Sequence, residues 1–251
     1  MKPRTRRTAV LATLLAATAV LTGCSGSSSG GSSDKADKGG KAASGTARAM
    51  LGELPVKKAA SKDGYDREAK FGRAWSDSTN APGSGNKCDT RNDILNRDLK
   101  DVHFDGASSC VIGSGRLKDP YTGKDIDFQR GRSTSSAVQI DHVIALGNAW
   151  VTGAQKLSQS DREALANDPL NLIAADGPAN GQKSDRDASQ WLPGNKSFQC
   201  PYVARQIAVK KKYKLWVTAE EKDAMGRVLD SCPNEKLPTD TSTEVTLKSQ
   251  R

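Results

Sequence analysis

Hydrophobic and polar residues in the middle of the chain follow first a strand pattern and then a helical one. Residues 138–146 are apolar apart from Gln139, Asp141 and His142, and they are rich in β-branched side chains. This composition predicts a strand that ends near His142. Residues 145–155 then predict a helix with an apolar face.

A second strand and a second helix are expected further along. Residues 161–167 suit a short helix that Asp168-Pro169 ends. Residues 170–175 are apolar and predict a strand, and a helix follows from Pro178 until Trp191-Leu192-Pro193. The central order is therefore strand, connection, strand, helix.

Elements on both sides of this centre complete an α+β prediction. Asp89 or Asn92 can cap a helix, and a turn signal at residues 119–124 separates two short apolar runs, which predicts an antiparallel hairpin. Residues 202–213 and 218–229 predict two C-terminal helices. Lysines at 210–212 in the first of them either follow a nucleic-acid backbone or form a solvated face.

The N-terminal residues read as a targeting segment. Basic residues precede an uncharged run at 8–22 that is short for a membrane span, and Leu21-Thr22-Gly23-Cys24 resembles a bacterial lipobox. We therefore expect a signal peptide at 1–23 and a lipidated Cys24, with an ordinary secretory signal as the alternative. Residues 24–46 are expected to be a disordered Ser/Gly/Lys linker, 47–234 a single domain, and 235–251 a disordered tail.

Cysteine usage agrees with export. Without Cys24 an even number of cysteines remains, which predicts two disulfides. Three pairings are possible, and we favour Cys88 with Cys110 and Cys200 with Cys232 because these are near in sequence. Zinc binding by the thiols is disfavoured because no Cys-x-x-Cys occurs.

The net charge of the chain gives little information about its function. The chain carries a formal charge of +9, which is compatible with a polyanionic ligand and common among other proteins as well. No Ser-His-Asp or paired-carboxylate arrangement stands out.

The acid–histidine step at Asp141-His142 carries the chemical prediction. A charged pair in an apolar strand is costly to bury without partners. A histidine near its ordinary pKa can take a proton from water, and a carboxylate can hold a divalent cation. Because consecutive strand residues point to opposite faces, both side chains serve one site only if the strand ends or bends there.

Three segments together carry a resemblance to a known family. Ile140-Asp141-His142-Val143, Leu170-Asn171-Leu172-Ile173 and Asn180-Gly181-Gln182-Lys183-Ser184-Asp185 resemble the HNH motif of ββα-metal nucleases. The sequence is most similar to secreted HNH proteins related to the C-terminal domain of GmrSD-type restriction enzymes, over most of residues 65–232. The last segment also resembles the HNH module of RNA-guided DNA nucleases. The finger core would span about 137–192.

The resemblance implies a role for each matched residue. His142 would be the general base, Asp141 and Asn180 the metal ligands, and Asn171 would hold the loop between the strands through hydrogen bonds to the backbone. Lys183 would contact phosphate or stabilise developing charge. Asp185 is a further candidate, which would bind metal through water, hold Lys183 or face solvent.

The expected cofactor and partners follow from this set. Asparagine at the third motif position favours a hard cation such as Mg²⁺, with Mn²⁺ or Zn²⁺ as alternatives. The predicted protein is an exported, lipid-anchored endonuclease that hydrolyses DNA phosphodiesters. The alternative is a catalytically silent surface lipoprotein that binds nucleic acid or an envelope polymer. The oligomeric state does not follow from the sequence.

Overall fold

The two central strands and the helix after them form the predicted unit. In the computed structural model, which describes residues 44–245, β4 (Val138–His142) pairs antiparallel with β5 (Leu172–Asp176). Helix α6 (Gly177–Lys183) follows at once, and the Asp176 side chain caps it by accepting from the backbone N–H of Ala179 at 2.8 Å. The ββα order and the α+β fold class are confirmed.

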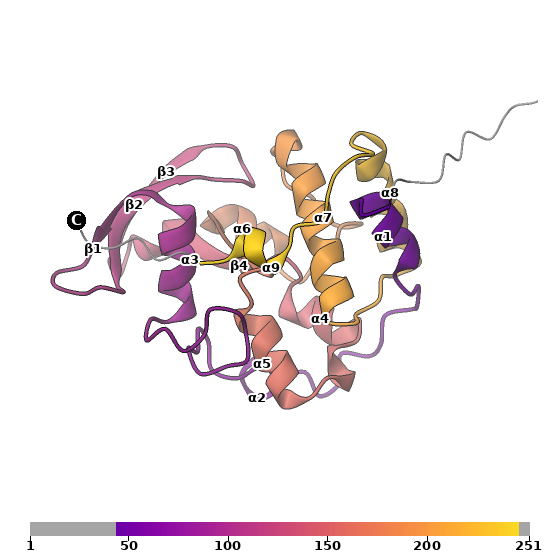
Figure 1. The fold of residues 1–251 in the computed structure, drawn as a ribbon, viewed down its shortest axis with the longest axis horizontal. Coiled ribbons are helices and arrows are strands. Elements are labelled where there is room, and N and C mark those ends of the chain that lie inside the picture. The colour runs from indigo at the N-terminus through magenta and orange to yellow at the C-terminus, as the bar shows by residue number, and fades with distance from the viewer. Residues whose placement is uncertain (1–43, 246–251) are drawn as a thin grey trace, which may run out of the picture. The chain divides into compact units, whose positions relative to one another are not determined.

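A second antiparallel sheet lies beside this unit (Figure 1). It has the order β1 (Lys100–Phe104), β2 (Ile112–Lys118), β3 (Asp125–Gln129). The predicted hairpin is β2–β3. The sequence did not predict β1, because its residues are mostly exposed and give no apolar run.

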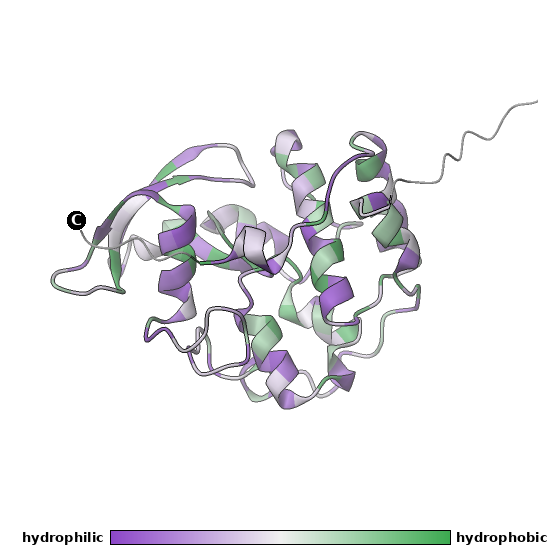
Figure 2. Cartoon of the chain, viewed as in Figure 1, coloured by the Kyte–Doolittle hydropathy of each residue, from purple (hydrophilic) through white to green (hydrophobic). Residues whose placement is uncertain are grey.

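The longer helices, such as α5 (Gln159–Asn167), α7 (Lys196–Lys212) and α8 (Ala219–Asp230), carry both hydrophilic and hydrophobic residues, as expected for elements with one buried face (Figure 2). The C-terminal pair is α7 and α8, and both pack against α1 (Ala47–Glu53). The remaining elements are α2 (Arg67–Phe71), α3 (Thr90–Asp98), the 3₁₀ turns η1 (Ser135–Ala137) and η2 (Ala154–Lys156), α4 (Leu146–Val151) and α9 (Asp240–Thr243).

Both favoured disulfides are present. Cys88–Cys110 joins the segment before α3 to the loop between β1 and β2. Cys200–Cys232 joins α7 to the segment just after α8. The first crosslinks the outer sheet to α3, and the second fixes the C-terminal helical pair. With these four cysteines oxidised, thiolate zinc binding is ruled out for them.

The C-terminal segment corrects an expectation. Disorder was predicted from residue 235, yet the chain is described to residue 245, and Lys236 pairs with Thr46 across an antiparallel bridge. Asp240 lies 2.7 Å from Lys212 Nζ, and the Thr243 carbonyl accepts from an Arg97 guanidinium at 3.1 Å. These partners lie far away in sequence, so composition did not reveal them.

The predicted signal peptide, Cys24 and most of the linker lie outside the described residues, as does the end of the tail. Among the helices of residues 44–245, none has the length and apolar character needed to cross a membrane.

Candidate active site

A cavity of about 240 Å³ lies between the end of β4 and the C-terminal half of α6. Four residues predicted from the sequence line it together: Asp141, His142, Asn180 and Asp185. Because β4 ends at His142, the two neighbouring side chains of this strand both reach the cavity although they leave the strand on opposite faces.

His142 is held as a neutral imidazole. The residue is only 6% exposed, and its Nε2 lies 2.9 Å from the carbonyl oxygen of Ala166. Since a carbonyl only accepts, Nε2 carries the proton and Nδ1 keeps its lone pair. Burial, and then the charge of Arg67, lowers the pKa of His142 to about 3. The sequence-based expectation of a pKa near its ordinary value is therefore wrong.

Asp141 is held from two sides. The Tyr121 hydroxyl donates to Oδ2 at 2.5 Å, and Lys183 Nζ donates to Oδ1 at 3.0 Å. Burial raises the pKa of Asp141, and the Lys183 ammonium and the Tyr121 hydroxyl oppose that rise. Both carboxylate oxygens thus accept hydrogen bonds from side chains, and the backbone N–H of His142 also stabilises the charged form.

Lys183 differs from its expected role. Its side chain has no exposed surface, and Nζ also donates to the carbonyl of His142 at 2.8 Å. A buried ammonium in this position cannot touch a substrate phosphate. It instead compensates the charge of Asp141, which is costly to bury alone.

Asn171 makes the kind of contacts expected of it. The residue is fully buried, its Oδ1 accepts from the backbone N–H of Ile144 at 2.8 Å, and its Nδ2 donates to the carbonyls of Ile144 and Leu165 at 3.3 and 3.2 Å. These bonds tie the segment just after His142 to β5. Asn171 is thus a positioning residue for the end of β4.

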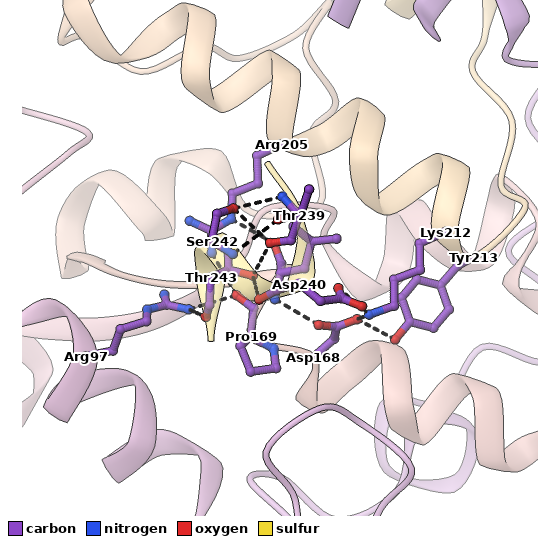
Figure 3. Close-up of polar contacts among 11 residues, drawn as sticks. Arg97, Asp168, Pro169, Arg205, Lys212, Tyr213, Thr239, Asp240, Ser242 and Thr243 are labelled. Atoms are coloured by element: carbon purple, nitrogen blue, oxygen red, sulfur yellow. Dashed lines mark hydrogen bonds and ion pairs between the residues drawn. The ribbon is translucent and has the colours of Figure 1, made fainter. Parts of the chain in front are cut away.

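The turn that carries Asn171 is itself clamped from outside the finger. Arg97 donates to the carbonyls of Pro169 and Leu172 at 2.9 and 2.7 Å, and Arg205 donates to the same carbonyls at 2.7 and 3.0 Å (Figure 3). Neither arginine carries a motif signature, so the sequence did not indicate them.

Asn180 and Asp185 are placed differently from each other. Asn180 Nδ2 donates to Gln139 Oε1 at 2.8 Å, and its Oδ1 accepts no hydrogen bond within residues 44–245. Asp185 pairs with Lys62 at 2.6 Å and does not hold Lys183. An amide oxygen thus remains free at the cavity, whereas this carboxylate already has a partner.

The donor set fits a hard divalent cation. In the described part of the chain no three His, Cys, Asp or Glu side chains converge as a metal site. Asp141 and Asn180 together still offer carboxylate and amide oxygens at one cavity. This suits Mg²⁺, which typically takes one or two protein carboxylates and keeps several waters.

Other basic candidates have structural partners. Arg130 donates to the Ile112 carbonyl and to Asn92 Oδ1, at 2.7 and 2.6 Å. Lys210 is fully buried and lies 3.1 Å from Glu221. Neither alternative given for the lysines at 210–212, a nucleic-acid contact or a solvated face, holds for Lys210, because its side chain is buried and donates to the Trp216 carbonyl at 2.9 Å.

Residues 89–228 match the family model of GmrSD restriction endonucleases, C-terminal domain. The chain belongs to this family. The match covers both strands of the finger, α6 and the clamping arginines.

A relative extends the likeness beyond the finger. An uncharacterized secreted protein of Arthroderma benhamiae is 36% identical over 192 residues, which are 76% of this chain and 86% of that protein. Together with the two disulfides, this secreted relative indicates an exported protein.

The sequence did not identify two residues that surround His142. Arg67 lines the main cavity, and it also lines a smaller one of about 10 Å³, large enough for about one water, on the Trp75 side of His142. The Trp75 ring stacks on the imidazole with centroids 5.7 Å apart and planes at 12°. The aromatic spacing of residues 65–75 indicated packing and gave no sign of this contact.

Proposed function

We propose that this protein is an exported, metal-dependent HNH-type endonuclease that hydrolyses nucleic-acid phosphodiesters, with DNA as its substrate. The observation that carries the proposal is the meeting of Asp141, His142 and Asn180 at one cavity, in a chain of the GmrSD C-terminal family. A lipid anchor on Cys24 is part of the proposal and rests on the sequence alone.

His142 would act through Nδ1. The Ala166 carbonyl fixes the tautomer, and burial keeps the ring neutral, so Nδ1 can accept a proton at physiological pH. In the proposed step a water oxygen attacks phosphorus, the bond from phosphorus to the 3′ oxygen breaks, water gives its proton to Nδ1, and the leaving oxygen takes a proton from solvent. Such a low pKa makes the imidazole a weak base.

Asp141 and Asn180 would hold the cation. When bound, a divalent ion offsets negative charge on the phosphoryl oxygens and makes water more acidic, which compensates for a weak base. Lys183 and Tyr121 orient the Asp141 carboxyl group through their hydrogen bonds, and Gln139 orients the Asn180 amide so that its oxygen faces away from the hydrogen bond.

Plasmid nicking tests this proposal. His142→Ala is expected to lower the cleavage rate at least ~100-fold, as for loss of a general base. His103→Ala is the matched control, because the chain has only two histidines and His103 is exposed on β1. Cleavage should need Mg²⁺ or Mn²⁺ and stop with EDTA.

Three results would count against parts of the proposal. Equal cutting by His142→Ala and the parent would remove the base assignment. Full activity in EDTA would remove the metal. DNA binding without cleavage under any metal would favour the alternative of a silent surface protein that binds nucleic acid.

A further inference from the structure

Residues 55–75, here termed the N-terminal arm, precede the part of the chain that matches the family, yet they reach the cavity. The arm is fixed to the core by backbone hydrogen bonds, from Lys57 to the Val217 carbonyl at 3.0 Å and from Ala60 to the Val151 carbonyl at 2.8 Å. Its ion pair between Lys62 and Asp185 joins it to the segment after α6. The arm is therefore fixed to the core and forms one wall of the cavity.

Helix α2 places the arm's cation at this wall. Asp66 caps α2, and Phe71 at its end is 1% exposed and packs edge-on against Tyr65 and Trp150. Arg67 is the first residue of α2. The buried end of the helix thus holds its exposed first turn in position.

Arg67 has no carboxylate partner in the described part of the chain. Its side chain is exposed, and within residues 44–245 no acid lies at ion-pair distance from it. Arg67 and His142 both line the main cavity and the smaller one beside Trp75. An unpaired guanidinium thus lies where the two cavities meet at the candidate base.

The C-terminal end of the arm also borders His142. Trp75 has a φ of +61°, a conformation that is rare for a bulky residue, and it stacks on the imidazole. Arg73 lines the smaller cavity and is also exposed, with no acid at ion-pair distance in the described chain. Cations and an aromatic ring therefore border His142 on the arm side.

We propose that Arg67 binds a backbone phosphate of the nucleic acid beside the scissile bond, so that the N-terminal arm completes the substrate site. The planar guanidinium offers paired N–H donors that match two phosphate oxygens, and it replaces the contact first expected from Lys183. This inference rests on the proposed nuclease function and adds a phosphate-binding residue from outside the family match.

Binding of a fluorescein-labelled 20-base-pair DNA duplex tests it, in a His142→Ala background so that the probe is not cut. Arg67→Gln is expected to weaken binding about tenfold at 0.1 M salt and to reduce the slope of log K against log salt by about one. Arg67→Lys should retain part of the affinity. The matched control is Arg227→Gln, which should change binding less than twofold, because Arg227 is an exposed arginine on α8 and has no ion-pair partner in the described part of the chain.

A kinetic comparison with His142 present separates the possible failures. Arg67→Gln should raise KM for plasmid cleavage about tenfold with unchanged melting temperature. If the parent cuts and Arg67→Gln binds and cuts like Arg227→Gln, the Arg67 assignment is overturned while the nuclease function stands. If the parent neither binds nor cuts nucleic acid, both proposals fail.

Discussion

Two lysine–carboxylate pairs are buried among the described residues, and they differ in their surroundings. Lys183 lies 3.0 Å from Asp141 beside a cavity, and the Tyr121 hydroxyl also donates to that carboxylate. Lys210 and Glu221 are 3.1 Å apart, with neither side chain exposed. No hydroxyl donates to Glu221 within residues 44–245.

The comparison separates a structural pair from a candidate site. The fully buried ion pair between α7 and α8 joins two helices and is not accessible to solutes. The pair at the end of β4 includes a carboxylate that retains free lone pairs and lines a cavity with His142. Burial of a charge therefore indicates a site only when the charged group also lines a space that a ligand can enter.

Breaking the pair between α7 and α8 should have the largest effect on stability. Glu221→Leu leaves the Lys210 ammonium buried without its acid and should lower the free energy of unfolding by about 3–5 kcal/mol. The double variant Lys210→Met with Glu221→Leu should recover most of this loss. Urea unfolding measures both, and equal losses in the single and double variants would contradict the explanation.

Breaking the pair at the cavity should cost less stability and more activity. Lys183→Met leaves Asp141 with the Tyr121 hydroxyl and an adjoining cavity, so we expect a loss of about 2–3 kcal/mol at pH 7. Cleavage per folded molecule should fall, because Asp141 loses the group that orients it. Glu221→Leu should leave cleavage per folded molecule unchanged; a matching decrease there would erase the distinction between the two pairs.

Sequence reasoning found the members of the site more reliably than their contacts. Asp141, His142, Asn171 and Asn180 follow a motif whose order along strand, strand and helix already implies one location. For Lys183 the motif implied either a phosphate contact or stabilisation of developing charge, and no pattern in the sequence indicated that its side chain is buried against Asp141.

Residues that border the finger from distant segments of the chain could not be identified from the sequence. Tyr121 lies in a turn, and Arg67 lies in a segment before the matched family region, yet both border the finger. Their contribution depends on how the chain packs between segments. A pattern with a period of two or 3.6 residues describes one element and contains no information on such packing.

Asp93 is a further buried carboxylate, and no lysine lies at ion-pair distance from it within residues 44–245. It is 5% exposed, Asn86 Nδ2 donates to its Oδ2 at 3.0 Å, and its Oδ1 has no hydrogen-bond partner within residues 44–245. Burial, and then the charges of Asp77 and Asp89, raises the pKa of Asp93 to about 7. The hydrogen bond from Asn86 opposes this rise only in part, and no cation lies at ion-pair distance from Asp93 in the described part of the chain.

Asp93→Asn should therefore have the smallest effect, and one that depends on pH. Since the folded pKa of Asp93 exceeds its unfolded value near 4, folding takes up a proton, and stability is lost as pH rises from about 4 through 7. Between pH 5 and 8 the parent should lose about 1 kcal/mol more unfolding free energy than the variant, after allowance for solvent screening. Urea unfolding at both pH values measures this difference. Because all other titrating groups are shared, identical pH dependence in the two proteins would show that Asp93 is already ionised at pH 5.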